Sequence, residues 1–166
     1  MKLQIIPYQQ TGEINFNDTY DEIIDKIKRI YHLKYTESEQ KVTQKTYRKI
    51  YIEDWDAVIS FDKEKLAIRY FEFFDNKLTL ILNDIILTDK NYSSLLELMK
   101  KSDKNLIVKD ESFISEKYGI EVHKNPTKPR EIESILIFSK EYLSEGEIDL
   151  NEFYKSIMGD DYNLYD

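Results

Sequence analysis

Few residues in this chain could carry acid–base or metal chemistry. It has two histidines, His32 and His123, and no cysteine. His32 is expected near the end of a helix, where an imidazole can complement the helix dipole. Glu121 and His123 alternate on one face of a predicted strand and could share a metal, but two ligands without a third make a poor metal site. We therefore expect no metal and no cofactor.

Sequence motifs of the common catalytic sites are also missing. The chain contains no G-x-S-x-G motif around a serine and no glycine-rich loop that could bind a phosphate. Without cysteine, thiolate catalysis and cysteine-ligated zinc are excluded as well. These features favour binding over catalysis, and we predict that the protein is not an enzyme. The alternative is a small hydrolase or metal-dependent enzyme that uses Glu121 and His123.

The negative charge of the chain is concentrated at its C-terminal end. The formal net charge is −8, and residues 141–166 contain eight acidic residues and one lysine. Acidic groups interleaved with rigid aromatic rings suit a surface that binds a basic partner. We predict that Asp160, Asp161, Tyr162 and Tyr165 contact such a partner. The simpler interpretation is a solvated acidic end that improves solubility.

A second acidic cluster surrounds the only tryptophan. Glu53, Asp54 and Asp56 flank Trp55, with a spacing that fits no calcium loop and lacks its glycine. The cluster can be a polar turn between strands, with Trp55 packed over the sheet edge. It can also be a recognition patch, because tryptophan is enriched among interface anchors. On the second interpretation Asp54, Trp55 and Asp56 join the predicted partner-binding residues.

Composition indicates a globular protein. With 166 residues, of which 41% are hydrophobic and 13% aromatic, the chain can bury a core. No apolar run approaches the ~18 residues of a membrane span, and residues 1–7 do not resemble a secretory signal. We therefore expect a cytoplasmic protein that does not bind membranes. Its negative net charge argues against nucleic acid as a partner.

Hydrophobic periodicity predicts an α+β protein with a mostly antiparallel sheet and two to three helices packed mainly on one face. Short connections between the strands, such as the turn at 62–65, favour hairpins. Residues 1–158 are expected to form a single domain, followed by an acidic, tyrosine-containing tail at 159–166. Residues 36–46 are expected to be a polar loop or an extended approach to a hairpin. The expected strands are 3–6, 12–16, 47–52, 57–61, 66–74, 78–82, 85–87, 106–108, 118–123 and 132–138, and the expected helices are 20–33, 92–101 and 150–158.

Five short segments resemble, in their order, small bacterial α+β proteins encoded beside polymorphic toxins, several groups of which are immunity proteins. These segments are Gly12-Glu13-Ile14-Asn15-Phe16, Ile59-Ser60-Phe61-Asp62, Phe71-Glu72-Phe73-Phe74, Tyr118-Gly119-Ile120, and Ile135-Leu136-Ile137-Phe138 with Tyr142. The resemblance implies a protein that binds and neutralises a cognate toxin, and it implies no catalytic residues.

Together these observations lead to the hypothesis of an immunity protein with an acidic, tyrosine-rich binding surface. The toxin would be basic; a nuclease is one example, because its cleft must bind phosphate. A further alternative is an adaptor that associates with itself through sheet edges. The sequence leaves the oligomeric state open.

Overall fold

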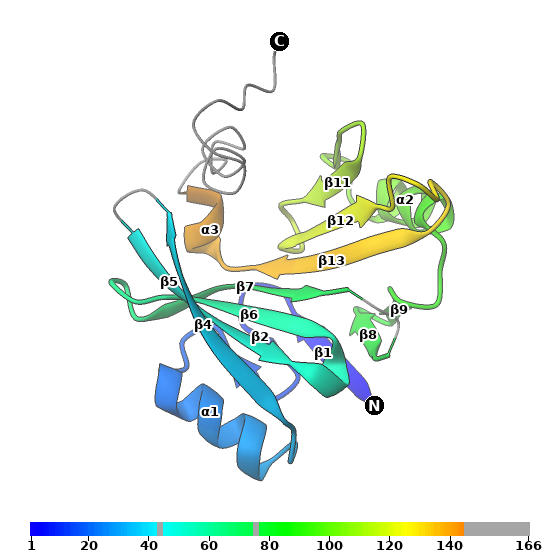
Figure 1. Ribbon diagram of the computed structural model, residues 1–166. Helices are drawn as coiled ribbons and strands as arrows, with labels where there is room; N and C mark the ends of the chain where they lie inside the picture. Colours follow the sequence, from blue (N-terminus) through cyan, green and yellow to red (C-terminus); the bar gives the residue numbers. More distant parts are fainter. Residues whose placement is uncertain (43–44, 75–76, 145–166) are drawn as a thin grey trace.

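Two β-sheets and three helices form the fold in the computed structural model, which describes residues 1–42, 45–74 and 77–144 (Figure 1). The expected α+β class is confirmed. The predicted helix at 150–158 and the predicted tail at 159–166 lie outside the described residues. None of the helices in the described part of the chain is long and apolar enough to cross a membrane.

The larger sheet has eight strands, and all neighbouring strands in it are antiparallel. Its strands follow the order β10 (Ile107–Val108), β11 (Ser112–Ser115), β12 (Ile120–Lys124), β13 (Ile132–Phe138), β7 (Ala67–Phe73), β6 (Ala57–Asp62), β5 (Lys45–Ile52) and β4 (Tyr35–Val42). The predicted hairpins therefore form, and the apolar run in β13 occupies the interior position that its composition favours.

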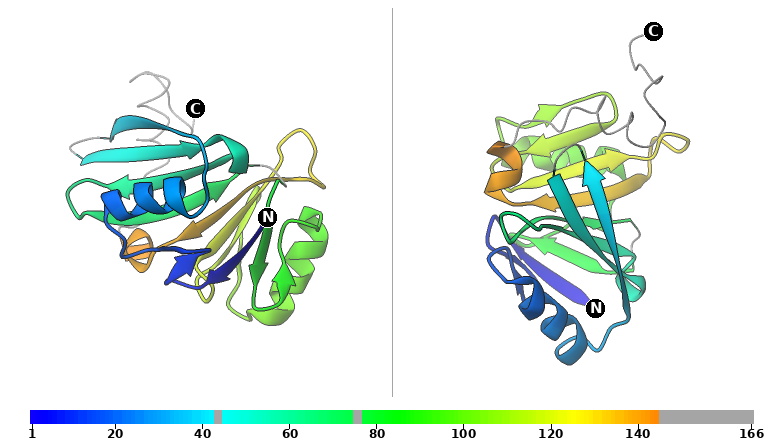
Figure 2. Two further views of the ribbon diagram at one scale, coloured as in Figure 1. Left: turned by 90° about the horizontal axis from the view of Figure 1, so that it is seen from below. Right: turned by 60° about the vertical axis from the view of Figure 1, so that its left-hand side comes forward.

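The smaller sheet has five strands and packs below the larger one (Figures 1 and 2). Its order is β3 (Ile14–Asn15), β2 (Gln10–Thr11), β1 (Lys2–Ile6), β8 (Thr79–Leu82) and β9 (Ile85–Ile86). The β1–β8 pair is parallel, and the other pairs are antiparallel. A single sheet was the expectation; the second sheet forms because the N-terminal strand pairs with a segment almost eighty residues later in the chain.

Helices α1 (Tyr20–Arg29) and α2 (Tyr92–Ser102) share one hydrophobic core with both sheets. Ile23 and Ile27 are the buried side of α1, and Leu95 and Met99 are the buried side of α2. The short helix α3 (Lys140–Ser144) instead contacts β7 from the other side of the large sheet, through Tyr142. Core contacts thus hold one face of the large sheet, and this leaves its opposite face for other interactions.

Two local predictions differ from the structure. Residues 36–42 belong to β4, an edge strand whose hairpin with β5 has polar side chains, so the sequence lacks the apolar alternation that marks a strand. Helix α1 ends at Arg29 rather than near residue 33, and His32 then adopts a positive φ of 54°. This reversal brings Tyr31 back against Trp55.

Candidate functional site

The large sheet has two different faces, because side chains alternate along each strand. One face carries Ile50, Ile59 and Phe71 into the core. On the other, strand register places one row of side chains across all eight strands: Thr36, Tyr51, Val58, Glu72, Leu136, Glu121, Ile114 and Ile107. We call this surface the polar face, after its members Lys49, Tyr51, Tyr70, Glu72, Glu121, His123 and Ser134.

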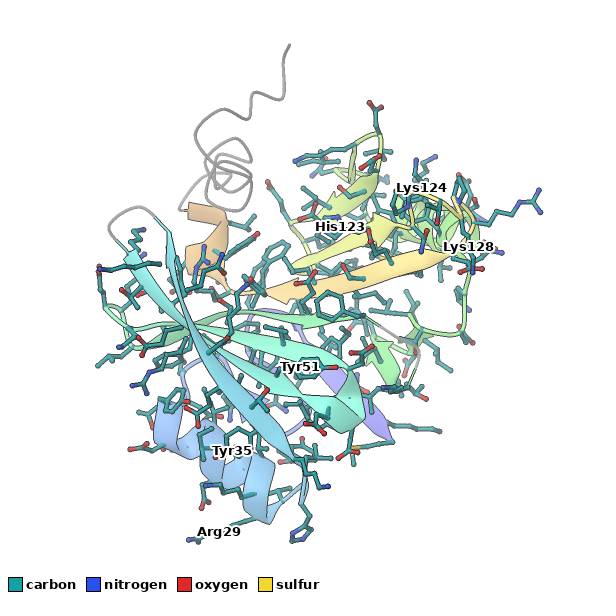
Figure 3. The ribbon with its side chains drawn as sticks, viewed as in Figure 1. Arg29, Tyr35, Tyr51, His123, Lys124 and Lys128 are labelled. Carbon is teal, nitrogen blue, oxygen red and sulfur yellow. The ribbon has the colours of Figure 1, made fainter. Side chains whose placement is uncertain are left out.

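Figure 3 shows how widely this face extends, with Tyr51 on β5 and His123 on β12. Three strands, β6, β7 and β13, separate these two residues. Both side chains are half-buried, so they remain accessible to a partner while their neighbours restrict them. An extended surface with half-buried side chains is more suitable for binding a protein than for binding a small molecule. Small-molecule sites are normally concave and enclosed.

Glu72 lies near the middle of the polar face. Ser134 Oγ donates a hydrogen bond to Glu72 Oε1 at 3.1 Å. Burial raises the pKa of Glu72 above its ordinary value, while the Ser134 hydrogen bond and the charges of His123 and Lys49 act in the opposite direction. A carboxyl group in this environment keeps its proton to a higher pH than an exposed one.

Lys49 is the cationic counterpart of Glu72 on the polar face. Burial lowers the pKa of Lys49, the charge of Glu72 opposes this effect, and Arg69 adds to it. Burial also raises the pKa of Tyr70, and the Glu72 carboxylate raises it further. Such groups cluster at functional sites because their desolvation stays unfavourable until a partner supplies complementary charge.

Glu121 and His123 lie on β12 as predicted, and Ser112 of β11 joins them. Ser112 Oγ donates to Glu121 Oε1 at 2.9 Å, and His123 Nε2 lies 3.6 Å from the same oxygen. The carboxylate therefore stands between the hydroxyl and the imidazole, whereas a serine triad needs the imidazole in the middle. Among the described residues, no group of three or more His, Asp or Glu side chains could hold a metal ion.

Aromatic side chains close the polar face beside α3. Tyr142 lies edge-on to Tyr70, with ring centroids 5.5 Å apart, and its ring centroid is also 5.5 Å from that of Phe138. The Arg69 guanidinium lies 4.2 Å from the ring centroid of Tyr47 and 5.3 Å from that of Tyr142. Burial raises the pKa of the Tyr142 hydroxyl. These contacts hold α3 against this end of the polar face.

The predicted residues Asp54, Trp55 and Asp56 form the turn between β5 and β6. Asp54 is exposed, and Asp56 adopts a left-handed conformation with φ 47° while its Oδ1 accepts a 2.7 Å hydrogen bond from Tyr51 Oη. Asp56 therefore adjoins the polar face through Tyr51. Trp55 is only 2% exposed and packs edge-on against Tyr31, with ring centroids 4.7 Å apart.

The burial of Trp55 corrects its assignment as a surface anchor. The 3₁₀ turn Glu53–Trp55 directs the indole into the core and leaves the acids outside, which is the packing role considered as the simpler interpretation. The other predicted contact residues, Asp160, Asp161, Tyr162 and Tyr165, lie outside the described residues, so the structure does not relate them to the polar face.

Sequence reasoning missed Lys49, Tyr70, Glu72 and Ser134. The sequence of β5 does contain an indication of this face, because Tyr47, Lys49 and Tyr51 alternate with Arg48 and Ile50. A similar alternation separates Tyr70 and Glu72 from Phe71 and Phe73. What the sequence could not supply was strand order and register, and these bring the polar sides of β5, β7, β12 and β13 together.

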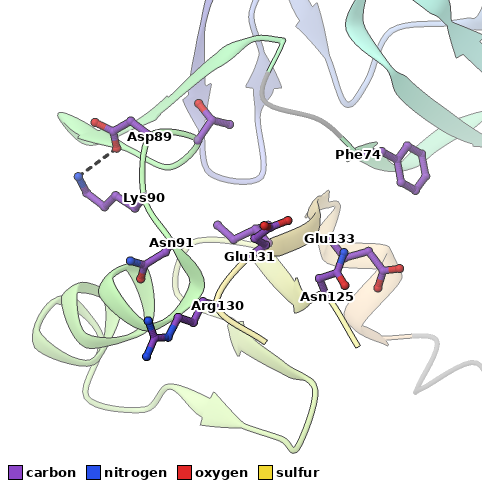
Figure 4. A pocket seen from close by; sticks show the side chains of 10 residues that line it. Phe74, Asp89, Lys90, Asn91, Asn125, Arg130, Glu131 and Glu133 are labelled. Carbon is purple, nitrogen blue, oxygen red and sulfur yellow. Dashed lines mark hydrogen bonds and ion pairs between the residues drawn. The ribbon is translucent and has the colours of Figure 1, made fainter. Parts of the chain in front are cut away.

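A pocket of about 800 Å³ lies where β7 ends and β13 begins (Figure 4). Its walls come from the end of β7, from the segment before α2, and from the connection between β12 and β13. It is linked to the predicted acidic turn, because Phe74 N donates to the backbone oxygen of Asp56 at 3.0 Å.

Comparison of the chain with protein-family models, curated proteins and solved structures gave no significant match.

Proposed function

We propose that this protein is an immunity-type inhibitor that binds and neutralises a protein toxin through the polar face of its large sheet. The observation that carries the proposal is the row of side chains across all eight strands, in which tyrosine and charged groups sit among apolar ones. The order of short sequence segments described above supports the same class of protein.

The chemistry of the polar face fits protein recognition. Half-buried tyrosines such as Tyr51 offer a large contact area at a low cost in side-chain entropy. Lys49, Glu72 and His123 provide charges that a partner must match, and this matching gives specificity. These groups are already partly desolvated in the free protein. They therefore lose less solvation energy when a partner binds than fully exposed charges would.

The acidic residues contribute the long-range part of the proposal. Asp54 and Asp56 lie beside the polar face, and the strongly acidic segment 145–166 follows α3 in the chain. Acidic groups around a contact surface accelerate the approach of a basic partner and are screened by salt. The toxin is therefore expected to carry a basic surface, such as the cleft of a nuclease.

The first experiment is capture of the partner from the native host's lysate at low and at high salt, followed by binding measurements on the purified pair. Tyr51→Ala should weaken binding about tenfold or more, as expected for an aromatic anchor. The control is Tyr35→Ala on β4, because Tyr35 lies on the opposite side of the sheet beside Lys28. Equal effects of the two substitutions, or no effect of Tyr51→Ala, would contradict a role for the polar face.

A second candidate function is acid–base catalysis on the same face, in a small hydrolase. The observation in its favour is the contact of Ser112, Glu121 and His123 next to Glu72, whose pKa is raised. This candidate predicts hydrolytic turnover of an ester or phosphoester probe that His123→Gln abolishes. Turnover that survives His123→Gln would exclude this site as its source.

A further inference from the structure

The pocket between the end of β7 and the start of β13 is lined by two asparagines whose orientation is fixed by the protein itself. Asn91 Oδ1 accepts a hydrogen bond from Ser94 N at 2.8 Å and caps α2. Asn125 Oδ1 accepts from Thr127 N at 3.0 Å and Lys128 N at 3.0 Å. Since the oxygen of each amide faces the backbone, the NH₂ group must point the other way.

Neither of these NH₂ groups has a hydrogen-bond acceptor within the described part of the chain, although both asparagines line the pocket. Figure 4 shows them on two sides of Glu131. Two preorganised donors at separate points of one pocket are matched by a ligand with at least two acceptor oxygens. Successive carbonyl groups of an extended peptide provide such acceptors.

The other residues that line the pocket have a different chemistry. Asp89 pairs with Lys90 at 3.0 Å, and Glu131 pairs with Lys128 at 3.3 Å. Glu133 has no such cation among the described residues, and its charge repels that of Glu72. Phe74 exposes 41% of its surface, whereas the other phenylalanines in the described part of the chain are buried.

The carboxylate of Glu133 on β13 and the exposed ring of Phe74, directly after β7, fit the side chain of arginine or lysine. The aliphatic stem of such a side chain can cover the ring, and its cationic group can reach the carboxylate. A cation at Glu133 would also relieve the repulsion between Glu133 and Glu72. The pocket therefore offers two side-chain amide donors, from Asn91 and Asn125, and a site for a cation at Phe74 and Glu133.

We propose that this pocket binds an extended peptide segment, with its carbonyl groups on Asn91 and Asn125 and a basic side chain against Phe74 and Glu133. The site differs from the polar face, although it adjoins that face through Phe74 and Asp56. A partner on the polar face could therefore place a basic loop here, but the proposal does not depend on that partner.

The test uses ¹⁵N-labelled full-length protein and a defined probe, N-acetyl-arginine N-methylamide, with N-acetyl-glutamate N-methylamide as the comparison. The side-chain NH₂ signals of Asn91 and Asn125 are assigned from Asn91→Ser and Asn125→Asp, which keep the capping oxygens and remove the NH₂ groups. Saturable shifts of both NH₂ signals with the arginine compound, but not with the glutamate compound, are the expected result.

Glu133→Gln should weaken binding of the arginine compound about tenfold, the effect of losing one charged hydrogen bond. Glu111→Gln, which removes the same charge from an exposed site on β11's flank, should leave it unchanged. No saturable shift, stronger binding of the glutamate compound, or equal effects of the two substitutions would overturn the proposal. None of these outcomes bears on the toxin-binding proposal, because the assay contains no partner protein.

Discussion

Glu72 and Lys49 are the residues whose environment most clearly separates the polar face from an ordinary solvated sheet surface. Burial is the largest influence on both pKa values, and it acts against the charged form of each group. Their mutual attraction only partly offsets this effect. A pair of this kind contributes little to stability, so its presence is more readily explained by binding than by folding.

Glu72→Gln should change the pH dependence of stability. Because the folded protein raises the pKa of Glu72 above its ordinary 4.5, its contribution to stability is complete below that pH and is lost as the pH rises through the folded-state pKa. The variant cannot ionise, so its stability relative to wild type should increase from pH 4 to pH 8. Urea unfolding at several pH values measures this, with Glu97→Gln on α2 as the exposed control. A difference that stays constant or shrinks with pH would contradict the raised pKa.

Trp55 offers a direct test of the corrected assignment. Trp55→Ala should destabilise the protein by about 3–5 kcal/mol, because it removes a large side chain from the core beside Tyr31. Asp54→Ala, one residue away but exposed, should change the free energy of unfolding by less than about 0.5 kcal/mol. Denaturant unfolding of both variants gives the comparison. Similar, small changes in the free energy of unfolding for both variants would contradict a core position for Trp55.

Among the elements, α1 shows how local sequence can define the start of a helix. Thr19 Oγ1 caps Glu22 N, and the Glu22 carboxylate accepts from Thr19 N at 2.8 Å, so the two residues form a capping box. Thr19→Ala should reduce stability by about 1 kcal/mol. Thr19→Ser keeps the hydroxyl and serves as the matched control in thermal or urea unfolding. Equal losses in both variants would show that packing of the threonine methyl group, rather than the cap, is responsible.

Strands were less predictable than helices, for a physical reason that β4 and β13 illustrate. In β13, four successive buried residues, Ile135 to Phe138, identify an interior strand without further information. In β4 the side chains are polar on both sides, and the strand exists because its backbone pairs along its whole length with β5. Backbone pairing requires no particular pattern of side chains, so such a strand cannot be recognised from hydrophobic alternation.

For the whole molecule, the distribution of charge is more informative than its total. Of the net charge of −8, residues 145–166 carry −6, from seven acids and Lys155. The rest of the chain is nearly neutral. Attraction of a basic partner over distances of a Debye length, ~10 Å at 0.1 M salt, must therefore depend mainly on this segment.

Charge reversal in this segment should slow association with the proposed basic partner. Asp160→Lys combined with Asp161→Lys should reduce the association rate constant at low salt and flatten its dependence on salt, with a smaller effect on dissociation. Glu64→Lys combined with Glu97→Lys makes the same change in net charge at exposed positions elsewhere. Stopped-flow or surface-binding kinetics measure the association rate constants of the two double variants. Unchanged association of the Asp160/Asp161 variant would remove these residues from the binding model.

The sequence by itself determined the α+β class, the positions of α1, α2 and most strands, and the concentration of acid at the C-terminus. These properties are local, because caps, periodicity and composition are read within short windows. The tertiary structure decided that Trp55 is buried, that the first strand pairs in parallel with β8, and that Lys49, Glu72 and His123 share one face. It also decided that Phe74, Asn91 and Asn125 line one pocket. Each of these results depends on the register and packing of segments far apart in the chain, which follow from the minimum free energy of the whole fold and not from any one segment.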